Sequence, residues 1–131
     1  MILAIDIGGT QYGLALATAK GRIVKRTTGR TDRSGGGGWM VTQVVAAGRR
    51  LLEAASEPVA ACGIGFGGPV DFEAQRIVNS THVPGWDDLP LPEVIREELG
   101  IPAVVDNDAN VGGLGEFWGE VRGSSSNIYV C

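Results

Sequence analysis

The sequence predicts an α/β protein with a mixed sheet that is opened by a three-strand antiparallel meander. Three short apolar runs separated by turn residues begin the chain, and they predict the meander. Segments with helical spacing of apolar residues then alternate with further short apolar runs. No G-x-G-x-x-G sequence opens a helix, so this order differs from the strict alternation of a dinucleotide-binding domain.

The meander is expected at the start of the chain. The run at residues 2–7 is rich in branched side chains and predicts a buried strand, and residues 12–18 alternate large with small side chains. A tight turn at 6–10 joins these two strands as a hairpin. A second turn at 20–21 leads into a third strand at 23–28.

The first helix is predicted over residues 39–56, where apolar residues recur at helical spacing. Pro58 ends it, because proline breaks a helix interior. Four successive glycines at 35–38 precede this helix, and we expect them to form a flexible surface loop that carries no chemistry. A strand at 59–66 follows, and it ends in a glycine-rich loop at 67–71.

The rest of the chain continues the alternation of helices and strands. Residues 76–79 are read as a short strand or a turn. A short helix follows at 91–99, with Pro92 in its first turn and Gly100 just past its end. A strand at 103–106 comes next. Two further elements are expected: a helix capped by Asn107 and Asp108 that runs to about Trp118, and a last strand at 127–131.

Composition and charge exclude several classes of protein. The chain has 131 residues, 11 Lys and Arg, 15 Asp and Glu, and 44% hydrophobic residues, which is typical of one globular domain. Its net charge of −4 argues against a nucleic-acid partner. No apolar run is long enough for a membrane span or a secretion signal, so we expect no membrane partner and a cytoplasmic location. Cys62 and Cys131 form no CxxC pair, which predicts buried free thiols.

The first candidate site is the turn between the first two strands. Asp6 ends a predicted buried strand, and Gly8, Gly9 and Thr10 follow it. Such a turn can direct backbone amides at phosphate oxygens, while a carboxylate beside it holds a hydrated Mg²⁺. The same residues equally fit a structural hairpin turn, so this motif alone leaves both interpretations open.

Two further clusters carry polar or small residues at strand ends. Asp106, Asn107 and Asp108 stand at a predicted helix start, where a carboxylate stays ionised and can accept a proton from a hydroxyl. Asn107 can bind sugar hydroxyls, although plain helix capping explains the same residues. The glycine-rich stretch at 63–71 predicts either the wall of a polyol pocket or a turn.

Together these clusters resemble the amino-terminal half of the ROK family of sugar kinases. The matching stretches are residues 6–10, 63–71, 84–86 and 106–110, in the family's order. The resemblance implies an actin-like, ribonuclease-H-like lobe that takes part in phosphoryl transfer from ATP to a hexose hydroxyl. It also implies an amino-terminal lobe at 1–122 and the start of a second, truncated lobe at 123–131.

On the sugar side, the resemblance implies four binding residues. Asp108 would be the catalytic base, Asn107 would bind a neighbouring ring hydroxyl, and Gly68 would contact the sugar through its backbone. His82 stands where the family has an Asn that reaches the sugar. Gly67 replaces a usual Pro, which loosens this loop.

On the nucleotide side, the resemblance implies that Gly8, Gly9 and Thr10 hold the phosphates of ATP. Asp6 would lie near Mg²⁺ and bind it through water. Zinc would belong only to the carboxy-terminal half that family members carry. The family also implies a homo-oligomer for the full-length protein and little or no turnover by this chain alone.

Two alternatives to the kinase remain open. The first is a non-catalytic, sugar-sensing module of a ROK repressor, which we rank lower because Asp108 is retained. The second is a ribonuclease-H-like nuclease in which Asp6 and Asp108 hold two metal ions. The chain lacks the basic balance that a nucleic-acid substrate requires.

Overall fold

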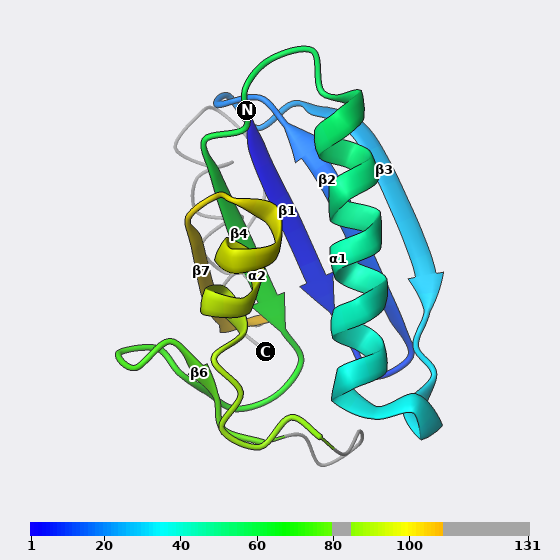
Figure 1. Cartoon of the computed structure of the whole chain (residues 1–131), viewed down its shortest axis with the longest axis vertical. Helices are drawn as coiled ribbons and strands as arrows, with labels where there is room; N and C mark the ends of the chain where they lie inside the picture. The colour runs from blue at the N-terminus through cyan, green and yellow to red at the C-terminus, as the bar shows by residue number, and fades with distance from the viewer. Residues whose placement is uncertain (80–84, 109–131) are drawn as a thin grey trace, which may run out of the picture.

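A computed structural model describes residues 1–79 and 85–108 of the chain (Figure 1). They form a five-stranded sheet in the order β3-β2-β1-β4-β7, two helices and a separate two-stranded hairpin, β5-β6. The sheet strands are β1 (Ile2–Ile7), β2 (Gln11–Ala17), β3 (Ile23–Arg30), β4 (Ala61–Phe66) and β7 (Ala103–Asn107). The other elements are the 3-10 turn η1 (Arg33–Gly35), α1 (Gly36–Ala54), β5 (Val70–Asp71), β6 (Arg76–Ile77) and α2 (Leu91–Leu99).

The sheet is mixed, as the sequence predicts. β1 pairs with β2 and β2 with β3 in antiparallel fashion, whereas β1 pairs with β4 and β4 with β7 in parallel. Parallel neighbours need long crossovers, and α1 and α2 supply them. The carboxyl ends of β1, β4 and β7 therefore meet at one end of the sheet.

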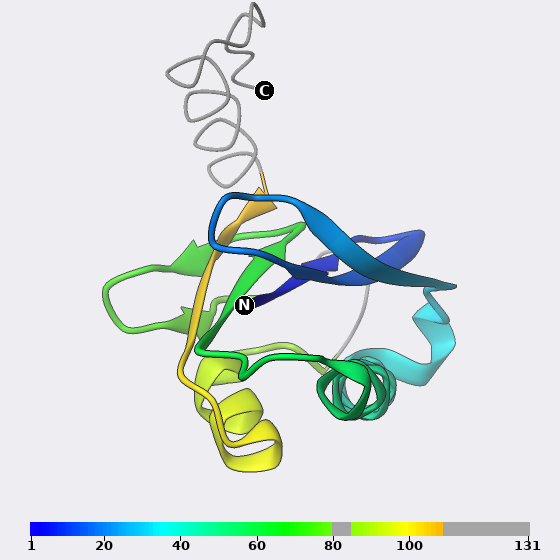
Figure 2. The ribbon, with the colours of Figure 1, turned by 90° about the horizontal axis from the view of Figure 1, so that it is seen from above.

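Both helices cover the same face of the sheet, which Figure 2 shows edge-on. Alternation along β1 places Leu3, Ile5 and Ile7 on that face, where they are buried. Burying each such side chain stabilises the fold by roughly 1.5–3 kcal/mol. Asp6 belongs to the other set of β1 residues and is exposed, so this carboxylate points away from the hydrophobic core.

The prediction of a flexible loop at residues 35–38 was wrong. Gly36, Gly37 and Gly38 belong to the first turn of α1, and the first two are buried. A Cβ atom added at Gly37 would lie only 2.6 Å from the carbonyl oxygen of Gly85. Glycine therefore lets the helix start pack directly against the backbone before the buried Trp86. Packing outweighs the low helix propensity of glycine here.

The other predicted elements of the described region are present, with small shifts at their ends. Helix α2 matches its predicted range, and Gly100 ends it in the left-handed region at φ 74°. The segment expected at 76–79 forms β6, and its partner β5 was not predicted. Asn107 is the last residue of β7 and Asp108 is the first helical residue, which agrees with a helix that opens at these two residues.

Several sequence-based expectations lie outside the described residues. They are the course of the helix beyond Asp108, the strand at 127–131, and the boundary between the lobes at 122 and 123. Cys62 is a buried free thiol as expected, and Cys131 lies outside the described part. Within residues 1–79 and 85–108, neither helix has the length and apolar character that a membrane span requires.

Candidate functional site

The candidate site lies where β1, β4 and β7 end. In the register of the sheet, Asp6 of β1 is opposite Gly65 of β4, and Gly65 is opposite Asp106 of β7. Asp108 follows β7 directly. Carboxyl ends of parallel strands are the usual place for a ligand in open α/β sheets. The motifs around Asp6 and Asp108, which are about 100 residues apart in the sequence, therefore meet at one end of the sheet.

Glycines keep the space between these motifs open. A Cβ atom added at Gly65 would lie 3.7 Å from Asp6 Oδ1 and 3.9 Å from the Cα atom of Asp108. One added at Gly67 would lie 3.4 Å from Asp108 Oδ2 and 3.6 Å from the Cα atom of Gly8. A side chain at either position would enter the region that the two carboxylates share. Glycine at Gly65 and Gly67 therefore keeps this space free of a side chain.

The two carboxylates influence each other electrostatically. Partial burial raises the pKa of Asp6 above its usual range, and the negative charge of Asp108 raises it further. A cation between them would remove this repulsion. The described residues contain no cluster of three side chains of the kinds that ligate metals. Two carboxylates nevertheless fit Mg²⁺, which keeps several waters and takes its remaining ligands from substrate phosphates.

The glycine turn after β1 is anchored through its carbonyl groups. Thr31 Oγ1 donates to the Gly8 carbonyl at 2.9 Å, and the Thr31 amide donates to the Thr10 carbonyl at 2.9 Å. Arg33 Nε donates to the Gly9 carbonyl, also at 2.9 Å. Within the described part of the chain, the amides of Gly9 and Thr10 have no acceptor. The turn is thus held by the segment after β3, which leaves donors for an anionic ligand.

Of the residues expected to bind sugar, Asn107 directly precedes Asp108, and Gly68 follows Gly67, whose added Cβ atom would meet Asp108 Oδ2. Asn107 ends β7, and its amide donates to Asp106 Oδ1 at 2.7 Å. Gly68 is tightly enclosed, because a Cβ atom there would lie 3.0 Å from Phe66 Cε1 and 3.3 Å from the Asn79 carbonyl oxygen. His82, the remaining predicted sugar residue, lies outside the described residues.

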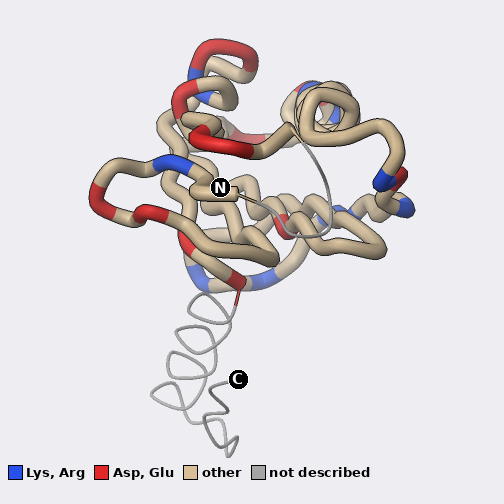
Figure 3. The backbone as a smooth tube through the Cα atoms, turned by 90° about the horizontal axis from the view of Figure 1, so that it is seen from below, with Lys and Arg blue, Asp and Glu red and all other residues tan. Residues whose placement is uncertain are grey.

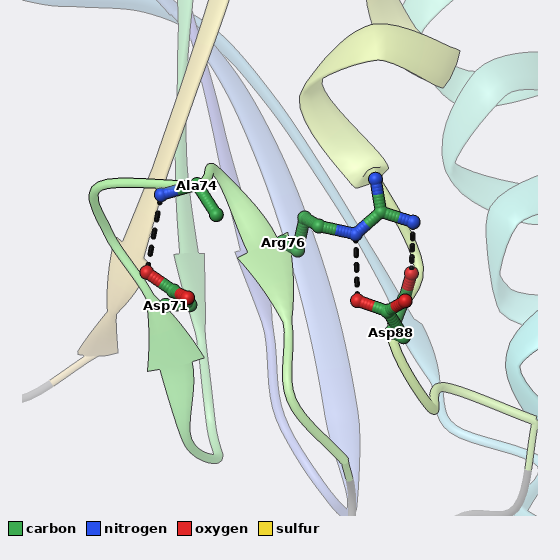
Figure 4. A network of polar contacts seen from close by, with 4 residues as sticks. All are labelled: Asp71, Ala74, Arg76 and Asp88. Atoms are coloured by element: carbon green, nitrogen blue, oxygen red, sulfur yellow. Dashed lines mark hydrogen bonds and ion pairs between the residues drawn. The ribbon is translucent and has the colours of Figure 1, made fainter.

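The β5-β6 hairpin beside the site is fixed by polar contacts that the sequence did not reveal (Figure 4). Asp71 Oδ1 accepts from the Ala74 amide at 3.1 Å. Arg76 Nε and Asp88 Oδ1 form an ion pair at 2.6 Å, and Arg76 also donates to the Asp88 carbonyl at 2.7 Å. Arg76 and Asp88 follow no periodic pattern, so no signal in the sequence marks them as partners. Together they join the hairpin to the segment that precedes α2.

Comparisons with known proteins agree with this geometry. The family model that matches residues 2–131 is described as the ROK family. A glucokinase of Halalkalibacterium halodurans is 32% identical over 131 residues, which are 98% of this chain and 39% of the relative. A xylose repressor of Caldicellulosiruptor bescii is 32% identical over 85 residues, which are 63% of this chain and 21% of the relative.

Solved structures show the same fold. The structure of a ROK family glucokinase from Streptomyces griseus, in complex with glucose and AMPPNP, is 29% identical with a TM-score of 0.78. The match covers 88% of this chain and 36% of that chain. It confirms the actin-like, ribonuclease-H-like lobe that the motifs led us to expect. The chain spans well under half the length of each of these relatives.

Proposed function

Because this chain belongs to the ROK family, we propose that it forms part of an ATP-dependent sugar kinase that transfers the γ-phosphoryl group to a hexose hydroxyl. One observation carries the proposal: Asp6, Asp108 and the turn at Gly8 come together at one end of the sheet. A base, a phosphate-binding turn and a bound Mg²⁺ form the minimal set for phosphoryl transfer, which depends mainly on positioning and charge.

In the proposed mechanism, Asp108 prepares the acceptor hydroxyl. Its carboxylate is exposed beside the glycine loop, where a sugar can approach it. The carboxylate accepts the hydroxyl proton while the hydroxyl oxygen bonds to the γ-phosphorus and the bond to ADP breaks. Asn107 binds a neighbouring ring hydroxyl, and the backbone at Gly68 lines the sugar. Asn107 directly precedes Asp108, and Gly68 follows Gly67, which faces Asp108; these positions support the two roles.

The nucleotide phosphates bind at the glycine turn in this proposal. The amides of Gly9 and Thr10 donate to phosphate oxygens, and the Thr10 hydroxyl adds a side-chain donor. Asp6 would hold Mg²⁺ through water, and the negative charge of Asp108 beside it favours a cation there. When bound, Mg²⁺ neutralises negative charge on the phosphates.

A second function is favoured by one observation, the similarity to a xylose repressor. A repressor of this type would bind sugar at the same end of the sheet without phosphorylating it. The two functions differ in turnover and not in fold, so turnover of the full-length protein separates them.

The test is ADP release by the full-length protein with Mg-ATP and each of glucose, fructose and N-acetylmannosamine. We expect sugar-dependent ADP release with at least one of them, and loss of that release with the corresponding 6-deoxy sugar. Tight sugar binding by calorimetry without any ADP release would overturn the kinase and favour the sugar sensor. ADP release that does not depend on sugar would also contradict the proposal.

A further inference from the structure

We propose that Gln75 is a positioning residue for Asp108, a role that rests on the proposed kinase function. Gln75 lies in the turn between β5 and β6, and Asp108 follows β7. The side-chain amide of Gln75 acts as a substitute strand neighbour along β7. It thereby fixes the strand end that carries Asn107 and Asp108.

The contact between Gln75 and β7 uses the complete side-chain amide. Gln75 Oε1 accepts from the Val105 amide at 2.7 Å, and Gln75 Nε2 donates to the Val105 carbonyl at 3.2 Å. Nε2 also donates to the Phe72 carbonyl at 2.6 Å. A primary amide has two hydrogens and one carbonyl oxygen, so every donor and the acceptor are engaged. The side chain therefore pairs with Val105 as a peptide group of a neighbouring strand would.

The position of β7 explains why it needs such a partner. Among the described strands β7 is at the end of the sheet and pairs only with β4. Alternate residues of an edge strand direct their amide and carbonyl away from the sheet, and both groups of Val105 meet Gln75. The Val105 side chain is fully buried. Without Gln75, the partly buried backbone amide and carbonyl of Val105, three residues before Asp108, would lose both hydrogen bonds.

The backbone of Gln75 has a conformation that residues other than glycine rarely adopt. Its φ angle is 55°, in the left-handed region that favours glycine. A residue with a Cβ atom is strained at such a turn, and glycine would relieve the strain. The hydrogen bonds of the Gln75 side chain to Val105 and Phe72 offset this strain. Substitution by glycine therefore separates the two effects, since it relaxes the backbone and removes the amide.

The hairpin that carries Gln75 is itself firmly held. The Ile77 amide donates to the Leu89 carbonyl at 2.9 Å, and Arg76 pairs with Asp88 on the same side. Asp71 caps the turn through the Ala74 amide (Figure 4). The turn that carries Gln75 is therefore fixed in place. Through the Gln75 side chain, the hairpin restrains the position of β7, which ends at Asn107.

The test compares Gln75→Gly and Gln75→Glu with Glu73→Gln in the full-length protein. Glutamate keeps the length of the side chain but cannot donate to the Val105 and Phe72 carbonyls. Glu73 is exposed in the same turn, so its substitution is the matched control. We expect the two Gln75 variants to lower kcat for the sugar between about tenfold and a hundredfold, with KM for ATP unchanged. We expect Glu73→Gln to retain both constants.

Hydrogen exchange provides a readout that does not depend on kinase activity. We expect peptides covering residues 103–108 to exchange faster in Gln75→Gly than in wild type, and unchanged in Glu73→Gln. Normal kcat in folded Gln75 variants would overturn the positioning role, even with faster exchange. If Gln75→Gly fails to fold, Gln75→Glu decides the question. If wild type phosphorylates no sugar, the proposed function fails, and unchanged exchange at 103–108 would separately reject the contact.

Discussion

Asp6 lowers the stability of the ligand-free protein, although it has a role in the proposed chemistry. Asp6 stands on the exposed face of β1, yet partial burial and the charge of Asp108 raise its pKa. The folded protein therefore binds a proton at Asp6 more tightly than the unfolded chain does. Protonation of Asp6 therefore stabilises the folded state at pH values below the pKa of Asp6 in the unfolded chain. This contribution is lost as pH rises through the higher pKa of Asp6 in the folded protein. Once it is ionised, the Asp6 carboxylate repels Asp108.

We predict that Asp6→Asn stabilises the ligand-free full-length protein at pH 7. The amide removes the repulsion with Asp108, so the advantage should shrink as pH falls below the usual pKa of an aspartate. Thermal unfolding at pH 7 and pH 3.5 measures this difference. Glu57→Gln, at an exposed residue before β4, is the charge-matched control and should show no such trend. A variant that is less stable than wild type at pH 7 would contradict the electrostatic account.

Cys62 provides a second test at the residue scale. Its thiol is buried in the core, and desolvation raises its pKa to about 12. Because only the thiolate reacts with alkylating reagents, we predict that native protein at pH 8 leaves Cys62 unlabelled by iodoacetamide. Mass spectrometry of peptides measures the labelling and separates Cys62 from Cys131. Labelling in the native state as fast as in urea would show that the strand is not packed as described.

The candidate site was largely predictable because its residues follow local rules. Asp6 and Asp108 each follow or end an apolar run, and parallel strands bring such ends together. Gln75 was not predictable, because its contact with Val105 spans 30 residues and depends on how a hairpin docks. The strand predicted at 103–106 continues one residue further, through Asn107, and Asp108 is helical directly after it, where the helix start was expected.

At the scale of elements, α1 shows where local propensity and packing disagree. Its first turn contains Gly36, Gly37 and Gly38, which the sequence alone places in a loop. The backbone of Gly85 approaches Gly37 too closely for any side chain. Only the docked segment around Trp86 reveals this requirement, and no periodic signal in the sequence encodes it.

Two adjacent glycines of α1 make a matched test of this packing. A Cβ atom at Gly37 would lie 2.6 Å from the Gly85 carbonyl oxygen, whereas one at Gly38 meets nothing within 4 Å. We predict that Gly38→Ala stabilises the protein by about 0.5–1 kcal/mol, the usual gain in a helix. Gly37→Ala should destabilise it. Chemical denaturation of the two variants measures both changes, and equal effects would contradict the close approach.

The edges of the sheet are protected in different ways. β3, at one edge, carries the exposed charges of Lys25, Arg26 and Arg30, which discourage pairing with another strand (Figure 3). β7 lies at the other edge of the described sheet, where the Gln75 side chain hydrogen-bonds the backbone amide and carbonyl of Val105. The charged edge can be read from the sequence, whereas the side-chain partner requires the tertiary structure.

At the scale of the whole molecule, the described residues form a five-stranded sheet with both helices on one face, a separate two-stranded hairpin, and a polar site at one end of the larger sheet. The mixed strand order follows from the sequence, since a meander precedes two helical crossovers. Hydrophobic residues of both helices and of alternate strand positions form a single core. This division leaves the carboxyl ends of β1, β4 and β7 for chemistry, away from the core that stabilises the fold.

The account as a whole depends on Asp108 acting as the base. The direct measurement is single-turnover phosphoryl transfer, by rapid quench with labelled ATP, in full-length wild type, Asp108→Asn and Glu57→Gln. Because a positioned base contributes about 10²–10⁴-fold, we predict at least a hundredfold slower transfer in Asp108→Asn, with sugar still bound and Glu57→Gln unaffected. Transfer by folded Asp108→Asn at the wild-type rate would contradict the account.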